Sequence, residues 1–209
     1  MGNIRPKLGG LFVSLAAVCR VVSELPLSWW PAPSPGDSYV FNPPLFSAIW
    51  AERILYPAVG SLAGVLLLIG LSTLFQRDSA EMASWQRSCA IGSLAGIGCI
   101  VVSVVTVQLL PAKAVVTGAL GALLGLLAAV IATVGLVGWG IGYVLFERYR
   151  LGGALAAIPL FEVLKLFRSL LGLDFEYAGG LFTAVIAFVL FTIGYVQWAG
   201  NALSSQKPS

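Results

Sequence analysis

The sequence predicts an all-α, multi-pass integral membrane protein that forms a single transmembrane domain over residues 1–209. Of its 209 residues, 58% are hydrophobic and only 10% are charged, and the mean hydropathy is +0.93. So few ionic side chains cannot cover a water-soluble surface. Long uncharged runs are the second observation, because a helix needs about 20 apolar residues to cross the hydrocarbon core of a bilayer.

Uncharged runs place most of the membrane spans. Four runs lack Asp, Glu, Lys and Arg over the length that a span requires: residues 54–75, 88–110, 114–146 and 177–199. A fifth run over residues 8–29 carries Arg20 and Glu24 near its end, where they lie one helical turn apart and can pair. We count it as the first of five spans. The run 114–146 would reach about 50 Å as one helix, so we expect it to tilt, bend or protrude.

The segment 151–171 has two interpretations. Pro159 suits the first position of a helix, and from there Glu162, Lys165 and Arg168 fall within one narrow polar wedge. As a sixth span, the segment would turn this wedge into the bundle, where Glu162 and Lys165 could neutralise each other. As an interfacial helix, it would leave Lys165 and Arg168 in the cytoplasm. We favour six spans, with these three residues as a candidate intramembrane polar face.

The loops between the spans carry an asymmetric positive charge, which predicts the orientation. Cytoplasmic loops of membrane proteins are enriched in Lys and Arg. With a cytoplasmic N-terminus, the outer side holds only Lys113 and the near-interface Arg20 and Arg53. The cytoplasmic side then holds Arg5, Lys7, Arg77, Arg87, Arg148 and Arg150. We therefore expect a protein of the cell membrane with its N-terminus in the cytoplasm.

The first outer loop is rich in proline and tryptophan, and with the helix that follows it covers residues 25–54. Proline restricts the backbone, so this loop should be preorganised. Asn42 and Pro43 suit the cap and first position of a short interfacial helix that would break near Pro57. The loop is either a rigid lid over the bundle or a surface for a partner subunit or apolar ligand, with the candidate residues Trp29, Trp30, Phe41 and Trp50.

Part of this region resembles the TspO (translocator protein) family. The similarity rests on Asn42-Pro43-Pro44, Trp50 and Leu55-Tyr56, after a loop rich in tryptophan and proline. It covers about fifteen residues. The spacing between these residues departs from that family's, and the later spans lack its Trp and Asn pattern, so we do not extend the resemblance to the rest of the chain.

Glycines are frequent and recur at helical spacing. Removing Cβ at positions i and i+4 lets two helix backbones approach closely, and such contacts drive helix association in lipid. The 24 glycines are therefore expected to pack helices within the chain or against neighbouring subunits. The candidate packing pairs are Gly60 with Gly64, Gly92 with Gly96, and Gly121 with Gly125.

Few polar groups in the spans are suited to chemistry. The chain has no histidine, which removes the commonest general base and the usual nitrogen ligand of haem, copper and zinc. The three cysteines are dispersed, and no phosphate-binding loop or paired acidic metal motif is present. We expect no cofactor, no metal, no catalytic residues and no nucleic-acid partner. Gln197 near the end of the last span should hydrogen-bond to a neighbouring helix.

These patterns favour a non-catalytic integral membrane subunit that packs within or assembles with a larger membrane protein complex. Its expected partners are membrane lipids and either other membrane subunits or further copies of this chain. The first alternative is a transporter or channel for a small or lipid-like solute, which requires a polar cavity lined by Ser, Thr and residues 162–169. A membrane enzyme is the less favoured alternative, because no acid–base pair is visible.

Overall fold

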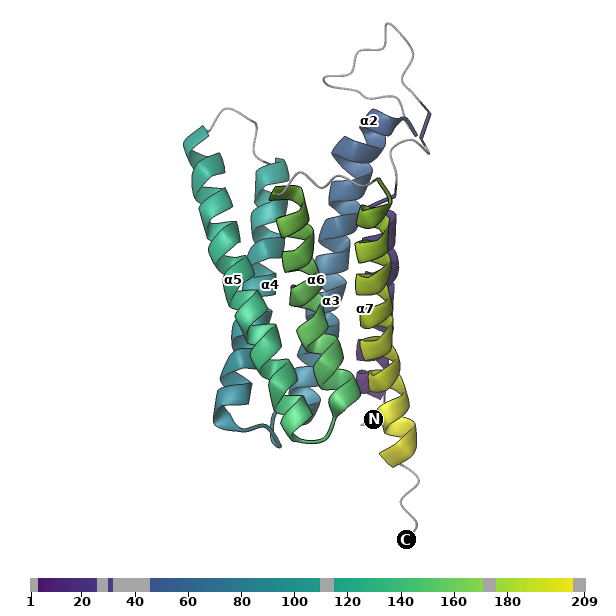
Figure 1. Cartoon of the computed structure of the whole chain (residues 1–209), viewed down its shortest axis with the longest axis vertical. Helices are drawn as coiled ribbons and strands as arrows, with labels where there is room; N and C mark the ends of the chain where they lie inside the picture. Colours follow the sequence, from purple (N-terminus) through teal and green to yellow (C-terminus); the bar gives the residue numbers. More distant parts are fainter. Residues whose placement is uncertain (1–3, 26–29, 32–45, 110–114, 171–175, 205–209) are drawn as a thin grey trace, which may run out of the picture.

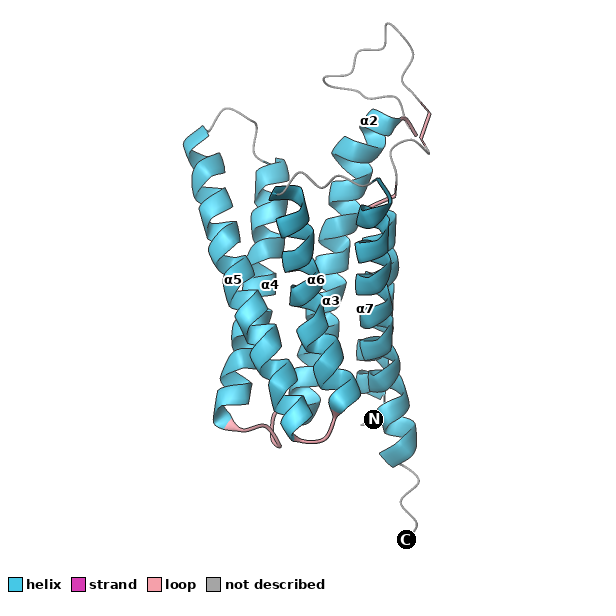
Figure 2. Cartoon of the chain, viewed as in Figure 1, coloured by secondary structure: helices cyan, strands magenta, loops and turns pink. Residues whose placement is uncertain are grey.

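The computed structural model describes residues 4–25, 30–31, 46–109, 115–170 and 176–204, and their regular structure is helical throughout, without strands (Figure 2). Four helical stretches of the described chain are long and apolar enough to cross a membrane: Ala48–Asp78, Ser84–Val105, Leu123–Leu145 and Phe182–Ala199. The prediction of an all-helical membrane bundle is confirmed. The long helices are α1 (Ile4–Val22), α3 (Tyr56–Asp78), α4 (Ser84–Leu109), α5 (Val115–Leu145), α6 (Tyr149–Leu170) and α7 (Glu176–Ser204).

The six long helices lie side by side, and each packs mainly against two others (Figure 1). The contacts close a ring in the order α1, α3, α4, α5, α6, α7 and back to α1. Helix α1 begins and α7 ends at the same end of the bundle, which we call the terminal end (Figure 1). We call the opposite end, where α1 ends, the loop end. Helix α6 runs along α5 and α7 between the two ends. Neither α6 nor α1 is among the four described stretches that are long and apolar enough to cross a membrane, so the six-span interpretation stays a prediction.

The first helix ends earlier than the sequence predicts. α1 stops at Val22 rather than near residue 29. Pro26 explains the difference, because the residue before a proline is disfavoured in the helical region of φ/ψ space. The carbonyl of Leu25 instead accepts a hydrogen bond from Tyr56 Oη at 2.6 Å.

The helix after the first outer loop also begins later than predicted. Asn42 lies outside the described residues, but Phe46 has φ 63°, which a helix running on from Pro43 could not contain. Helix α2 (Ala48–Trp50) begins instead after Ser47, whose Oγ accepts the Trp50 backbone N–H at 3.2 Å. The N-cap of α2 is therefore Ser47, and the predicted cap at Asn42 stays untested.

Pro57 does not break the helix, contrary to the prediction of a separate interfacial helix. α2 continues through a π-helical turn, η2 (Ala51–Leu55), directly into α3. In this turn the Tyr56 N–H donates to Ala51 O, one residue further back than in an α-helix. A proline lacks an N–H, and its ring would clash with the carbonyl of Arg53, four residues before it. The wider π-turn accommodates both features, so the helix continues into the span.

Pro159 likewise lies inside a helix rather than at its first position. α6 begins at Tyr149 and passes through Pro159 without interruption. The chain reverses before it, at Glu147, which has φ 61°. The sequence predicted that the helix begins at the proline because proline is common at the first position of helices in soluble proteins. In membrane proteins, neighbouring helices can satisfy the backbone groups that a proline frees.

Close backbone contacts divide the ring into two groups of three helices. In four of the six contacts, a Cβ added to a glycine would lie within 3.1 Å of the neighbouring helix's backbone. These contacts join α3 to α1, α1 to α7, α4 to α5, and α5 to α6, with examples at Gly70, Gly10, Gly96 and Gly140. The described parts of α3–α4 and α6–α7 show no such backbone contact and touch less extensively. The groups are therefore α3–α1–α7 and α4–α5–α6.

Most of the predicted packing glycines face neighbouring helices of the same chain. Cβ atoms at Gly64 and Gly96 would lie 2.6 Å from Val101 Cγ2 and 2.7 Å from Ala128 O, respectively. Gly60, Gly92 and Gly125 have looser intrachain neighbours, at 3.8, 3.9 and 3.5 Å. The surroundings of Gly121 lie outside the part that the structure describes. Apart from Gly153, where an added Cβ would have no neighbour within 4 Å, the glycines whose surroundings are described thus face other parts of the bundle.

Buried side chains fill the centre of the ring. Trp139 of α5 is fully buried, and its ring meets Phe75 of α3 edge to face at 6.4 Å between centroids. Around them lie Leu71, Leu74, Leu155 and Ile193, each at most 1% exposed. Gln197 donates from Nε2 to the carbonyl of Gly70 on α3 at 3.2 Å, which confirms the predicted interhelical hydrogen bond.

Candidate functional site

A polar cluster at the loop end joins the two groups of helices. Arg20 on α1 pairs with Glu24 one turn later, Nη2 to Oε1 at 2.9 Å, as the sequence predicts. The same Nη2 atom lies 2.9 Å from Oε1 of Glu162 on α6. Thr183 of α7 donates from Oγ1 to Glu24 Oε2 at 2.6 Å. One guanidinium therefore holds two carboxylates from different helices.

This cluster changes the expected role of the candidate polar face. Glu162 contacts Arg20, which lies 142 residues away in the sequence and on another helix. The side chains of Lys165 and Arg168 lie outside the described residues. Glu162 and Arg20 are 42% and 29% exposed, so water or lipid headgroups can still reach the pair. Partial exposure and paired charge are typical of a structural ion pair near the membrane surface.

A second polar cluster joins the two groups at the terminal end. Its centre is Asp78, the last residue of α3, whose side chain is only 7% exposed. Oδ2 accepts hydrogen bonds from Arg77 Nη2 at 2.8 Å, Tyr143 Oη at 2.7 Å and Arg148 Nη1 at 3.1 Å. Arg148 also reaches Glu81 at 3.1 Å. Several donors around one buried carboxylate stabilise its charge.

Sequence reasoning missed this second cluster. It treated Arg77 and Arg148 only as orientation signals, and Asp78 fell just beyond the predicted span. Tyr143 lies 65 residues from Asp78, so no local spacing connects them. The available signal was a carboxylate directly after an arginine at the end of an uncharged run, since a charge in that position requires a partner.

Four aromatic side chains form a continuous cluster at the loop end, which we call the aromatic surface: Trp30, Phe46, Trp50 and Tyr56. The ring centroids of Phe46 and Trp50 are 5.3 Å apart, those of Trp50 and Trp30 6.0 Å, and those of Trp30 and Tyr56 6.4 Å. Trp30 Nε1 donates to Tyr56 Oη at 2.7 Å. Trp30 and Trp50 were predicted for this surface, whereas Trp29 and Phe41 lie outside the described residues.

Phe46 is the most unusual member of the aromatic surface. The residue is 64% exposed and its backbone has φ 63°, in the left-handed region that bulky residues avoid. The two residues after Phe46 are held in place, because Ser47 caps α2 and the Ala48 N–H donates to Pro31 O at 3.1 Å. Strain of this kind persists where surrounding structure holds it and often accompanies function.

The described side chains provide little for metal or redox chemistry. Within the described part of the chain, no three His, Cys, Asp or Glu side chains lie close enough together to hold a metal ion. Cys19, Cys89 and Cys99 are all free thiols. The polar clusters are carboxylates paired with guanidinium groups, whose chemistry is charge pairing and hydrogen bonding.

Comparison of the chain with models of known protein families, with curated proteins and with solved structures finds no match in any of the three. The resemblance to the TspO family therefore stays limited to the short stretch that carries it. The fold itself defines the class: this is a helical membrane protein.

Proposed function

We propose that this chain is a non-catalytic integral membrane subunit that assembles with another membrane protein through the aromatic surface. The observation that carries the proposal is Phe46, a strained and exposed aromatic residue at the edge of an ordered cluster. Exposed aromatic rings held in a fixed arrangement lose little conformational freedom on binding, so they are frequent anchors of protein interfaces.

The polarity of the aromatic surface suits a protein partner. Hydrogen bonds from Trp30 to Tyr56 and from Tyr56 to Leu25 satisfy the polar atoms inside the cluster and leave its apolar faces for contact. The cluster lies at the end of a span, where a partner helix and its loop would meet it. Most of the described glycines already face other parts of the same chain, so the aromatic surface is the better candidate interface.

Replacing Phe46 by glycine should separate assembly from folding. Glycine tolerates positive φ, so relief of strain should offset the lost contact with Trp50 and change the stability of the isolated chain by less than about 1 kcal/mol. The exposed ring itself would be lost, and we expect the complex to dissociate. Native mass measurements in membrane-derived nanodiscs would compare the particle size of the variant with that of the wild type.

A photoreactive amino acid at position 46 would identify the partner. We expect one defined membrane protein to cross-link there but not from position 124, an outward-facing residue of α5 that is 63% exposed. Adducts in multiples of 21.9 kDa would identify a second copy of this chain instead. A wild-type chain that is a lone monomer, or equal cross-linking at both positions, would contradict the proposed assembly.

We further propose that the chain lies in the cell membrane with the terminal end in the cytoplasm. The described cations at the terminal end outnumber those at the loop end, and positive charge favours the cytoplasmic side. The loop end carries Arg20 and Arg53, and the last turns of α6 add Lys165 and Arg168. The terminal end carries Arg5, Lys7, Arg77, Arg87, Arg148 and Arg150.

Cysteine labelling of intact cells would test this orientation. In a variant whose native cysteines are replaced by serine, a cysteine at exposed position 80 should resist an impermeant thiol reagent. A cysteine at exposed position 52, at the opposite end, should react within minutes. Labelling at 80 and protection at 52 would reverse the assignment.

Solute transport remains the alternative. It calls for a polar cavity within the bundle, whereas the described interior is filled by apolar side chains around Trp139. A groove between α1 and α7 lies instead on the surface of the bundle that faces away from its centre. These observations support the subunit proposal over transport.

A further inference from the structure

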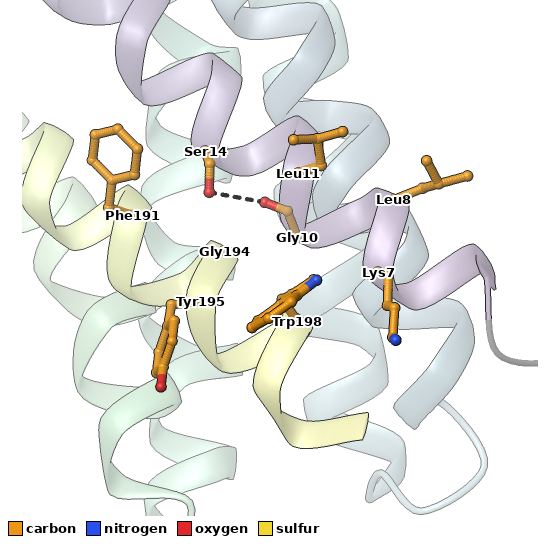
Figure 3. A pocket seen from close by; sticks show the side chains of 9 residues that line it. All are labelled: Lys7, Leu8, Gly10, Leu11, Ser14, Phe191, Gly194, Tyr195 and Trp198. Carbon is orange, nitrogen blue, oxygen red and sulfur yellow. Dashed lines mark hydrogen bonds between the residues drawn. The ribbon is translucent and has the colours of Figure 1, made fainter. Parts of the chain in front are cut away.

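A groove of about 630 Å³ lies between α1 and α7 on the surface of the bundle that faces away from its centre (Figure 3). Its floor is made where the two helix backbones meet: a Cβ on Gly10 would lie 2.5 Å from Gly194 O. The volume falls within the roughly 300–1,000 Å³ of typical small-molecule sites. Because the helices already touch at the glycines, a depression remains between the larger side chains on either side.

The walls of the groove change from apolar to cationic along its length. Phe191 and Ser14 lie at one end, and Lys7 and Trp198 at the other, toward the terminal end of the bundle (Figure 3). Ser14 Oγ is satisfied by Gly10 O at 3.1 Å, so the inner end is apolar in character. Lys7 is exposed and takes part in none of the salt bridges among the described side chains.

The position of the groove matches the layers of a membrane leaflet. Lys7 and Ser14 are seven residues apart on α1, which corresponds to about 10 Å along the helix. Tyr195 and Trp198 are 63% and 54% exposed, and such amphipathic rings favour the boundary between headgroups and hydrocarbon. The cationic end therefore lies at headgroup depth, and the apolar end reaches into the hydrocarbon.

We infer that this groove binds an anionic phospholipid from the leaflet at the terminal end. The headgroup phosphate pairs with Lys7, and an acyl chain lies along the apolar wall beside Phe191. The charge decides the class of lipid, because a lysine near the membrane surface attracts anionic headgroups by about 1 kcal/mol. This inference is independent of the aromatic surface, which lies at the opposite end of the bundle.

Native mass spectrometry of the full chain in mild detergent would test the site. The probes are phosphatidylglycerol and phosphatidylcholine with identical acyl chains. We expect the wild type to prefer phosphatidylglycerol, because the choline ammonium of phosphatidylcholine offsets the attraction of its phosphate to Lys7. Lys7→Gln should weaken binding of phosphatidylglycerol about five-fold and binding of phosphatidylcholine by less, so that the preference is reduced. Arg150→Gln is the matched control, since it removes an exposed cation at the same end of the bundle but away from the groove.

A second pair of variants tests the acyl-chain wall. Phe191→Ala should weaken binding of both lipids, whereas Phe188→Ala, which removes a 72% exposed phenylalanine of α7 that does not line the groove, should weaken neither. Equal effects of Lys7→Gln and Arg150→Gln, or no preference for phosphatidylglycerol in the wild type, would overturn the inference. Full competition by glycerol phosphate, which has no acyl chains, would overturn the role of the groove wall.

Discussion

Replacing Gly152 by alanine is expected to lower the free energy of unfolding by about 3 kcal/mol, the upper end of the usual cost of overpacking. A Cβ at this position would lie 2.5 Å from Gly140 O and 2.9 Å from Val144 N. Both neighbours are backbone atoms of α5, so no side chain can rotate away and the two helices must separate. The loss would be measured by unfolding in mixed micelles of mild and denaturing detergent.

The adjacent residue supplies a matched control. Gly153 is on the same helix, but a Cβ there has no neighbour within 4 Å. Gly153→Ala should therefore change stability by less than about 1 kcal/mol, with a gain from helix propensity if any. Gly140→Ala disturbs the same contact as Gly152→Ala, so the double variant should lose less than the sum of the two. Similar losses for Gly152→Ala and Gly153→Ala would show that α5 and α6 do not meet in this way.

Replacing Asp78 by alanine is expected to cost a similar amount, again about 3 kcal/mol. The substitution removes the acceptor shared by Arg77, Tyr143 and Arg148. Tyr143 is 3% exposed, so its hydroxyl would lose its partner in a place that water reaches poorly. Because this cluster ties α3 to α5 and to the turn before α6, hydrogen exchange should also accelerate at the amides of residues 146–150.

Two variants separate the buried carboxylate from its exposed neighbour. Glu81 bonds to the same Arg148 but is 75% exposed, so Glu81→Ala should cost less than about 1 kcal/mol. Tyr143→Phe removes one donor and keeps both arginines, and we expect a loss of about 1 kcal/mol. If Glu81→Ala were as costly as Asp78→Ala, general charge at this end would matter more than the buried cluster.

Spans were more predictable than helix ends. A span is predicted from the hydropathy of about 20 residues together, so one polar residue hardly changes its predicted position. Helix ends depend on one or two residues, and the predictions that a helix breaks near Pro57 and that another begins at Pro159 were both wrong. A π-turn accommodates Pro57, and packing between neighbouring helices accommodates Pro159. Tertiary contacts in a membrane can override local propensity in this way.

Part of the candidate sites could also be predicted. The Arg20–Glu24 pair follows from i,i+4 spacing, and Trp30 and Trp50 were expected at the outer surface. The left-handed backbone of Phe46 and its exposure are visible only in the structure. The lipid groove had no sequence signal, since its residues come from the two ends of the chain.

The sequence by itself determined that this chain is a helical membrane protein, because composition and the length of apolar runs are properties of the linear chain. Only the tertiary structure decided which charges meet. Arg20 finds Glu162 across 142 residues, and Asp78 finds Tyr143 across 65. The order in which helices close a ring sets these pairings, and that order depends on where small residues let backbones approach. A burial pattern read along one helix cannot specify which helix lies opposite.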